Sequence, residues 1–226
     1  MTTKIARITG LVALALCLAR PAAAQVPPAY AVTYLEIKSG AVSAARKALG
    51  DYGAASRKEA GNLSFTVLEE TGRGSRFAIL ETWASRAVLE QHYRAPSAAQ
   101  MLAHLAGLRT APDDRRIYAA LYAAAPENHT GPIHVMTHVD VMPPFAAGCA
   151  QLLKAMRADT PGDHGNVAYD VLRQDHELNH FTVAEVWASR KDFEAHASAT
   201  HTRAFRQKLL PMTGALFDER VFTEIP

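Results

Sequence analysis

Two matched sets of side chains carry the residue types that acid–base chemistry needs. The first set is Glu81, Trp83 and His92, and the same spacing recurs at Glu185, Trp187 and His196. An imidazole titrates near neutral pH, so His92 and His196 are candidate bases, and a nearby carboxylate can orient such a base. The simpler alternative is that the histidines only hydrogen-bond across the fold and that the tryptophans belong to the core.

The recurrence extends along most of the chain. At an offset of 104 residues without a gap, the segment 81–86 falls on the segment 185–190, and the two tryptophans of the protein are equivalent. Such a period is longer than the roughly 20 to 50 residues of a solenoid repeat and fits a small domain. The sequence therefore predicts a duplicated domain, in which each candidate residue has a counterpart in the other half.

Each half shows strand and helix signals in the same order. The predicted elements of the first half are strands over 30–37, near 63–67, ending at 83 and from 115 to 122, a helix from 41, and helices over 86–94 and 97–107. These follow from apolar residues that alternate in strands and recur every three to four positions in helices. Ser85 and Ser189 are placed to cap the helices that follow them. The order β-α-β-β-α-β is that of a ferredoxin-like unit, which makes the protein α+β.

A four-stranded sheet with helices on one side leaves its other face open, and a second copy can cover that face. The third strand has two faces, one with Ala78, Leu80 and Thr82 and the other with Phe77, Ile79, Glu81 and Trp83. We expect the smaller set to meet the helices and the larger set to face the space between the two sheets. The two sheets should face each other within one chain or across a dimer.

The first 24 residues have the pattern of a signal peptide. Lys4 and Arg7 precede an apolar run over 8–19, and small residues before Gln25 offer a cleavage site. The run is shorter than the roughly 20 residues of a membrane span. We therefore expect a periplasmic or secreted protein without a membrane span. Its predicted parts are 1–24 as signal peptide, 25–124 as first domain, 125–131 as linker and 132–226 as second domain.

Cleavage would also change the charge balance and the cysteine content. Removing the signal peptide lowers Lys+Arg from 24 to 21 against 22 Asp+Glu, and this balance argues against a nucleic-acid partner. Cys149 would be the only cysteine left, so no disulfide can form within the mature chain. It aligns with Ala45 of the first half, which predicts a small core residue rather than a reactive thiol.

Two longer motifs support a resemblance to a known family. Gly-Asn-(Leu/Val)-x-(Phe/Tyr)-x-Val-Leu begins at Gly61 and Gly165, and Phe-x-(Ile/Val)-x-Glu-x-Trp-Ala-Ser-Arg begins at Phe77 and Phe181. With a histidine nine residues after each tryptophan, this arrangement resembles the antibiotic biosynthesis monooxygenase domain, in two tandem copies. The resemblance implies a dimeric α+β barrel, which most members build from two chains and which the halves here could build within one.

The resemblance also implies a reaction, namely oxygenation or oxidation of a small phenol or hydroquinone by O₂ with no flavin, metal or other cofactor. Such chemistry needs a base that creates an electron-rich anion and a dry pocket that protects the peroxide formed. The implied roles are an aromatic wall for Trp83 and Trp187, orientation of a partner for Glu81 and Glu185, and oxyanion donation for Asn62 and Asn166. The alternatives are a structural acceptor for each glutamate and turn chemistry for each asparagine.

The halves differ at polar positions that would line a pocket. Tyr34 aligns with His138, Tyr93 with Ala197, and Tyr118 with Phe222. We include Tyr34 and His138 among the candidate substrate-binding residues and expect that one half is active. The second half is favoured because it places more imidazoles, including His138 and His201, near its candidate pocket.

The histidine spacings do not predict a metal site. His134 and His138 share a strand face about 13 Å apart, too far for one ion, and His196 and His201 miss the i, i+4 spacing of a helix. His176 and His180 could meet across a hairpin turn, but they make only two ligands. Haem-degrading relatives use an asparagine and an axial histidine where this chain has Thr33 and Thr137, and Met101 and Phe205. That difference argues against haem cleavage, although His104 and His201 leave adventitious haem binding open.

Three classes of function stay open from the sequence. The first is an exported monooxygenase of the quinol monooxygenase type, with a small aromatic substrate and O₂ as its partners. The second is a non-catalytic exported binding protein for a small apolar or haem-like ligand, and the third is a tandem structural module without a pocket. A homodimer is compatible with each. Oxygen uptake with a panel of hydroquinones would separate the first class from the others.

Overall fold

The computed structural model describes residues 26–124 and 129–225. The elements of the first half are β1 (Ala29–Glu36), α1 (Val42–Ser56), β2 (Asn62–Glu70), β3 (Arg76–Trp83), α2 (Arg86–Arg94), α3 (Pro96–Leu108) and β4 (Asp114–Tyr122). Those of the second half are β5 (Ile133–Asp140), α4 (Ala146–Asp159), β6 (Asn166–Gln174), β7 (His180–Trp187), α5 (Arg190–Ala197), α6 (Thr200–Leu209) and β8 (Asp218–Glu224). Each half is therefore the predicted ferredoxin-like unit with its second helix divided in two.

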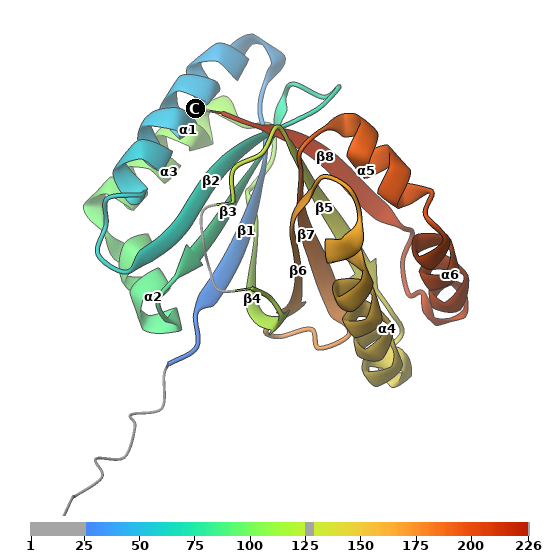
Figure 1. Cartoon of the computed structure of the whole chain (residues 1–226). Helices are drawn as coiled ribbons and strands as arrows, with labels where there is room; N and C mark the ends of the chain where they lie inside the picture. Colours follow the sequence, from blue (N-terminus) through green and yellow to red (C-terminus); the bar gives the residue numbers. More distant parts are fainter. Residues whose placement is uncertain (1–25, 125–128, 226) are drawn as a thin grey trace, which may run out of the picture.

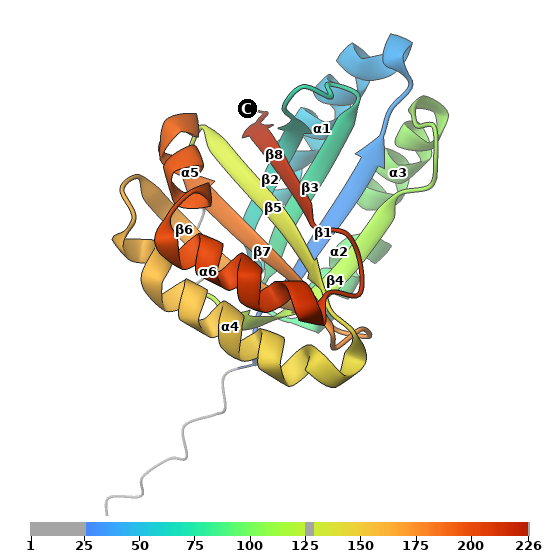
Figure 2. The ribbon, with the colours of Figure 1, turned by 90° about the vertical axis from the view of Figure 1, so that its right-hand side faces the viewer.

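The eight strands close into one barrel. Their order is β1-β3-β2-β8-β5-β7-β6-β4, so the two halves meet where β2 pairs with β8 and where β4 pairs with β6. The helices of each half lie outside its own sheet, on the face away from the other half (Figure 1, Figure 2). This confirms the predicted α+β pseudo-dimer and shows that its barrel is complete within a single chain.

Strand pairing repeats with the offset seen in the sequence. Ala29 lies opposite Trp83 at one end of the β1–β3 pair, and its equivalent Ile133 lies opposite Trp187 in the β5–β7 pair. The pairs β2–β3 and β6–β7 also share a register shift just after the first residue of β2 and of β6. The gapless repeat therefore corresponds to two units with the same strand order and the same irregularities.

The predicted orientation of the third strand was wrong. Phe77, Ile79 and Trp83 pack with α1 and α2 in a core outside the barrel. Ala78 instead lies in the barrel core, with Leu80 packed against it. The helices need large apolar partners, whereas the inside of an eight-stranded barrel is just wide enough for side chains from all its strands. Small residues on β3 leave room inside the barrel for four aromatic rings, which belong to Tyr30, Tyr34, Tyr118 and Phe222.

Local sequence signals account for several element ends. The Ser85 and Ser189 side chains each accept a hydrogen bond from a backbone N–H three residues on, as predicted for helix caps. Gly61 and Gly165 have φ of +81° and +76°, a left-handed conformation that favours glycine in the turn before β2 and β6. Cys149 is fully buried on α4, where burial raises the pKa of its thiol to about 12.

Two predicted segments fall outside this description. The signal peptide, 1–24, lies wholly outside the described residues, and the predicted linker, 125–131, lies outside them over 125–128. Within 26–124 and 129–225, no helix is long and apolar enough to cross a bilayer.

Both tryptophans are fully buried at matching strand ends, as the repeat predicted. We expect Trp83→Ala and Trp187→Ala each to lower the free energy of unfolding by about 3 to 5 kcal/mol, because a large cavity opens beneath the helices. Urea denaturation of the purified protein measures this loss. Leu216→Ala is the control, since Leu216 is 93% exposed and its loss should change stability by less than about 0.5 kcal/mol. Losses below about 1 kcal/mol in both tryptophan variants would contradict the packing argument.

Candidate active site

A Glu–Trp–His set lies beneath the helices of each half. In the first half the indole N–H of Trp83 donates to Glu81 Oε2 at 2.8 Å, and the ring of His92 stacks on Trp83 with centroids 4.4 Å apart. In the second half the Trp187 indole donates to Glu185 Oε2 at 2.8 Å, and the His196 ring lies 4.8 Å from that of Trp187. Residues two apart on a strand share a face, so each pair points at the same helices. The structure thus brings together the side chains that the repeat singled out.

In the first half this set is saturated with hydrogen bonds. The Tyr93 hydroxyl donates to Glu81 Oε1 at 2.6 Å. His92 has partners at both ring nitrogens, with Nε2 2.7 Å from the Tyr52 hydroxyl and Nδ1 2.9 Å from Glu59 Oε2. The Arg115 guanidinium lies over the Tyr93 ring, 3.9 Å from the ring centroid. Together with Glu59 and Trp83, these tyrosines give every ring nitrogen of His92 and each oxygen of Glu81 a partner.

The second half lacks the side chains that close the first. The positions of Tyr52, Tyr93 and Arg115 are held by Met156, Ala197 and Glu219. Within the described residues, Glu185 has a single side-chain hydrogen bond, the one from Trp187, and no donor reaches its second oxygen. A cavity of about 20 Å³ lies between the sheet and helices α4 and α6. Its lining includes Glu185, His196, Tyr169, Thr202, Arg206 and Phe217.

Burial changes the acidity of the carboxyl group in this cavity. The side chain of Glu185 is 5% exposed, and desolvation raises its pKa to about 8, with a smaller lowering from the Trp187 hydrogen bond and a further rise from the charge of Glu219. Burial also raises the pKa of Glu81, but there two hydrogen bonds, from Tyr93 and Trp83, favour the ionised form. Glu185 is therefore largely protonated at neutral pH and loses its proton as the pH rises through about 8.

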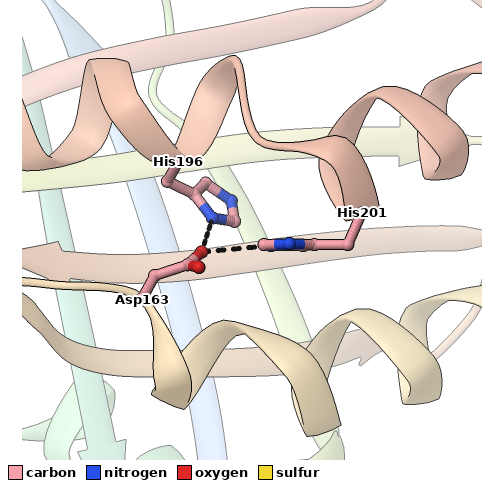
Figure 3. Close-up of side chains that lie close together, drawn as sticks. All are labelled: Asp163, His196 and His201. Carbon is pink, nitrogen blue, oxygen red and sulfur yellow. Dashed lines mark hydrogen bonds and ion pairs between the residues drawn. The ribbon is translucent and has the colours of Figure 1, made fainter.

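His196 connects this carboxyl group to a second cluster. Its Nε2 lies 3.9 Å from Glu185 Oε2, and its Nδ1 lies 2.6 Å from Asp163 Oδ2. His201 approaches the same Asp163 oxygen, with its Nε2 3.0 Å away, so two imidazoles converge on one carboxylate (Figure 3). Burial lowers the pKa of His196, although Asp163 raises it in part.

The five-residue spacing of His196 and His201 does not keep them apart, because one continuous helix does not join them. Helix α5 ends at Ala197 and α6 begins at Thr200, so the chain turns between the two histidines. Histidines five residues apart point in different directions only when one straight helix carries both, and here the turn between α5 and α6 separates the two helices.

The comparisons with known proteins agree with the geometry of both halves. Residues 28–104 and 132–208 match the sequence profile of the family described as antibiotic biosynthesis monooxygenase. The chain belongs to this family. It carries two tandem copies of the antibiotic biosynthesis monooxygenase domain, as the sequence motifs predicted. Among curated proteins, none matches the chain.

Solved structures share the fold over nearly the whole chain. A candidate monooxygenase from Fusobacterium nucleatum subsp. nucleatum superposes with a TM-score of 0.77 at 16% identity, covering 89% of this chain and 94% of that one. A candidate monooxygenase from Lactobacillus acidophilus gives 0.71 at 14% identity, covering 88% and 95%. An anthrone oxidase-like protein gives 0.70 at 14% identity, covering 88% and 92%. At these identities the likeness concerns the fold, including its tandem arrangement.

Tyr34 and His138 do not line the cavity of the second half. The Tyr34 hydroxyl lies 2.8 Å from His138 Nε2 in the barrel interior, and His138 Nδ1 lies 3.0 Å from the Thr182 hydroxyl. Burial lowers the pKa of His138 to about 4, so its ring is neutral at physiological pH. Because strand residues alternate between faces, Thr137 lines the cavity with His196 and its neighbour His138 points the other way. The expectation that His138 belongs with His196 and His201 was therefore wrong.

The two asparagines of the family motif serve the backbone. Asn62 Nδ2 donates to the Ser64 carbonyl at 3.3 Å, and Asn166 Nδ2 donates to the Ala168 carbonyl at 3.2 Å. Each bond spans the register shift at the start of its strand. This arrangement agrees with the turn alternative and places neither amide in the lining of the second-half cavity.

Sequence reasoning missed Asp163, which holds His196 and faces His201. Asp163 aligns with Glu59 of the first half, and Glu59 makes the same contact with His92. The repeat therefore contained the signal as a carboxylate retained at equivalent positions. It also missed Arg206 and Glu219, which pair at 3.1 Å at the edge of the cavity.

The acidity of Glu185 predicts a pH-dependent stability. Its pKa of about 8 in the fold exceeds the ordinary value of 4.5, so its contribution is fully present below pH 4.5 and is lost as pH rises through 8. We expect Glu185→Gln, which keeps an oxygen for the Trp187 N–H, to gain up to a few kcal/mol over the unchanged protein between these limits. Urea denaturation in EDTA at several pH values measures the difference.

The companion variant Glu81→Gln provides the comparison, because Glu81 accepts two hydrogen bonds that favour its charge. Its gain over the same pH range should be smaller. A Glu185→Gln stability curve parallel to that of the unchanged protein would show that Glu185 titrates normally.

Proposed function

We propose that the second half is a cofactor-independent monooxygenase site for small electron-rich aromatics such as hydroquinones. The observation that supports this most is the buried Glu185 carboxyl group, which faces a cavity with one oxygen unbonded where the first half has a closed network. The Trp187 indole donates to that group at 2.8 Å, and His196 Nε2 lies 3.9 Å from it. The family membership supports monooxygenase-type chemistry, and the substrate class is our proposal.

In the proposed reaction the ionised form of Glu185, the minor form at neutral pH, accepts a phenolic proton and so creates an electron-rich anion. That anion passes an electron to O₂, and recombination forms a carbon–oxygen bond to a peroxide. Loss of water from the peroxide leaves a hydroxyquinone that contains one oxygen atom from O₂. The substrate supplies all the electrons, so the balance closes without a reduced cofactor. The residues contribute proton transfer and the exclusion of water from the intermediate.

The cavity as it stands admits little more than a water molecule. Its volume is about 20 Å³, and an aromatic ring needs more room. Phe217, which is 45% exposed, is the wall residue best placed to move, because it lies on the segment between α6 and β8. The Arg206 guanidinium lies 5.1 Å from the centroid of the Phe217 ring. If Phe217 moves, Arg206 would move with the ring or take its place at the mouth of the cavity.

The binding-protein alternative has its own location. A separate cavity of about 40 Å³ lies inside the barrel, with Tyr30, His134 and Met136 in its lining. Its walls are mostly apolar, and His134 Nε2 is buried there without a hydrogen-bond partner. A small apolar ligand bound here, without oxygen uptake, would favour that alternative. Export is likewise proposed, on the signal-peptide pattern of residues 1–24.

The first activity test compares matched variants of the two halves. Glu185→Gln should lower hydroquinone-dependent oxygen uptake by about 10² to 10⁴, because the proton acceptor is lost while the Trp187 hydrogen bond remains. Glu81→Gln, the same change in the closed half, should retain the rate. Oxygen-electrode traces of the metal-stripped protein with a panel of hydroquinones provide the measurement. Equal rates in both variants would rule out Glu185 as the base.

The second activity test widens the mouth of the cavity. Phe217→Ala removes a half-exposed ring from the wall, so we expect a lower KM for bulky hydroquinones with little loss of stability. Initial rates of oxygen uptake over a range of substrate concentrations give KM and kcat separately. Leu216→Ala is the neighbouring control, because this exposed residue is not in the cavity lining. An unchanged KM in Phe217→Ala would place substrate entry elsewhere.

A further inference from the structure

We propose that Asp163, His196 and His201 form a binding site for one divalent transition-metal ion. The inference goes beyond the proposed oxygenase and does not rest on it. It rests on three side chains from separate elements that aim potential ligand atoms at one point: Asp163 before β6, His196 on α5 and His201 on α6 (Figure 3). One ligand atom from each residue lies within 4.8 Å of the others.

The distances are close to those of a metal site. Asp163 Oδ2 lies 2.6 Å from His196 Nδ1 and 3.0 Å from His201 Nε2. Bonds of 2.0 to 2.1 Å in a tetrahedral zinc site place neighbouring ligand atoms about 3.3 Å apart. An increase of less than about 1 Å would bring both oxygen–nitrogen distances to this value. The Asp163 side chain is 23% exposed and is therefore not enclosed on every side.

One atom of the cluster has no hydrogen bond to satisfy it. His201 Nε2 is buried and has no hydrogen-bond partner among the described residues, even though Asp163 Oδ2 is only 3.0 Å away. The contact is short, but its angles do not make a hydrogen bond. A buried nitrogen without a partner is costly, and a metal ion that accepts its lone pair would remove that cost.

The ligand types select the class of ion. Two imidazole nitrogens and one carboxylate oxygen suit Zn²⁺ and neighbouring first-row ions better than Mg²⁺ or Ca²⁺, which prefer oxygen. Three protein ligands leave a position for water, and the site lies near the protein surface, because the side chains of Asp163 and His201 are each 23% exposed. The three side chains therefore match an open zinc-type site near the protein surface.

The surroundings of His196 fit a metal ligand. Its Nδ1 points to the cluster, and its Nε2 faces the buried Glu185 carboxyl group at 3.9 Å. Histidine ligands commonly direct their second nitrogen at a carboxylate, which fixes the orientation of the ring. Glu185 lies on that side of His196 here, at a distance longer than a hydrogen bond.

The first half is an internal comparison that lacks the site. Glu59 and His92 reproduce the Asp163–His196 contact at 2.9 Å, but Ser97 stands where His201 would be. The second nitrogen of His92 is also engaged, 2.7 Å from the Tyr52 hydroxyl. We therefore expect one strong site per chain rather than one in each half.

Titration with Zn²⁺ tests the proposal. Isothermal titration of the EDTA-dialysed full chain should give one Zn²⁺ per molecule, and Co²⁺ should show visible d–d bands from the same site. His201→Ala should weaken binding by more than about 100-fold, because losing a ligand costs more than the 10- to 100-fold of a supporting partner. Asp163→Asn should weaken Zn²⁺ binding at least about tenfold. This second variant tests the site independently if His201→Ala fails to fold. Far-UV circular dichroism confirms that each variant is folded.

His164→Ala is the matched control. His164 is adjacent to Asp163 but 95% exposed, and it pairs with Asp192 instead of the cluster. This variant should bind Zn²⁺ like the unchanged protein. The proposal is overturned if no saturable site exists, if His201→Ala binds normally, or if His164→Ala loses the site. Because binding is read without substrate, its failure is distinct from a failure of oxygenase activity.

Discussion

Closure of the barrel is the constraint on which the rest of this structure depends. Each half on its own would leave the apolar inner face of a four-stranded sheet in water and two edge strands without partners. The pairings of β2 with β8 and of β4 with β6 remove both edges, and the inner faces become one core. The helices are thereby confined to the outside, so each half keeps its own space between sheet and helices.

Duplication lets that space diverge between the halves. Both retain the buried Glu–Trp pair with its 2.8 Å hydrogen bond and a histidine against the indole. In the first half Tyr93 adds a second hydrogen bond to the carboxylate and Tyr52 a second partner to the imidazole, which favours rigidity. In the second half their absence leaves a buried carboxyl group facing a cavity, an arrangement that costs stability and is typical of functional sites. Because both halves close one barrel, the closed network of the first half contributes to the fold that contains the second-half cavity.

The second-half histidines show how one substitution changes the chemistry of a shared frame. A carboxylate bound to the first histidine is common to both halves, at Glu59 and at Asp163. Only the second half adds His201, and this residue converts a pair into a cluster of three potential ligands. His196 belongs both to this cluster and to the lining of the cavity, so a change at one place can alter the other.

The sequence by itself determined the duplication, the order of the elements, the helix caps and the burial of both tryptophans and Cys149. These follow from local patterns and from an offset without gaps, which do not depend on what packs against each element. Tertiary structure alone decided which face of β3 meets the helices. Both faces of this strand are apolar enough to be buried, and only the closure of the barrel determines which one turns inward. It also decided that His138 points into the barrel and that His201 reaches Asp163. Strand phase and the turn between α5 and α6 set these positions, and neither can be read from spacing along the chain.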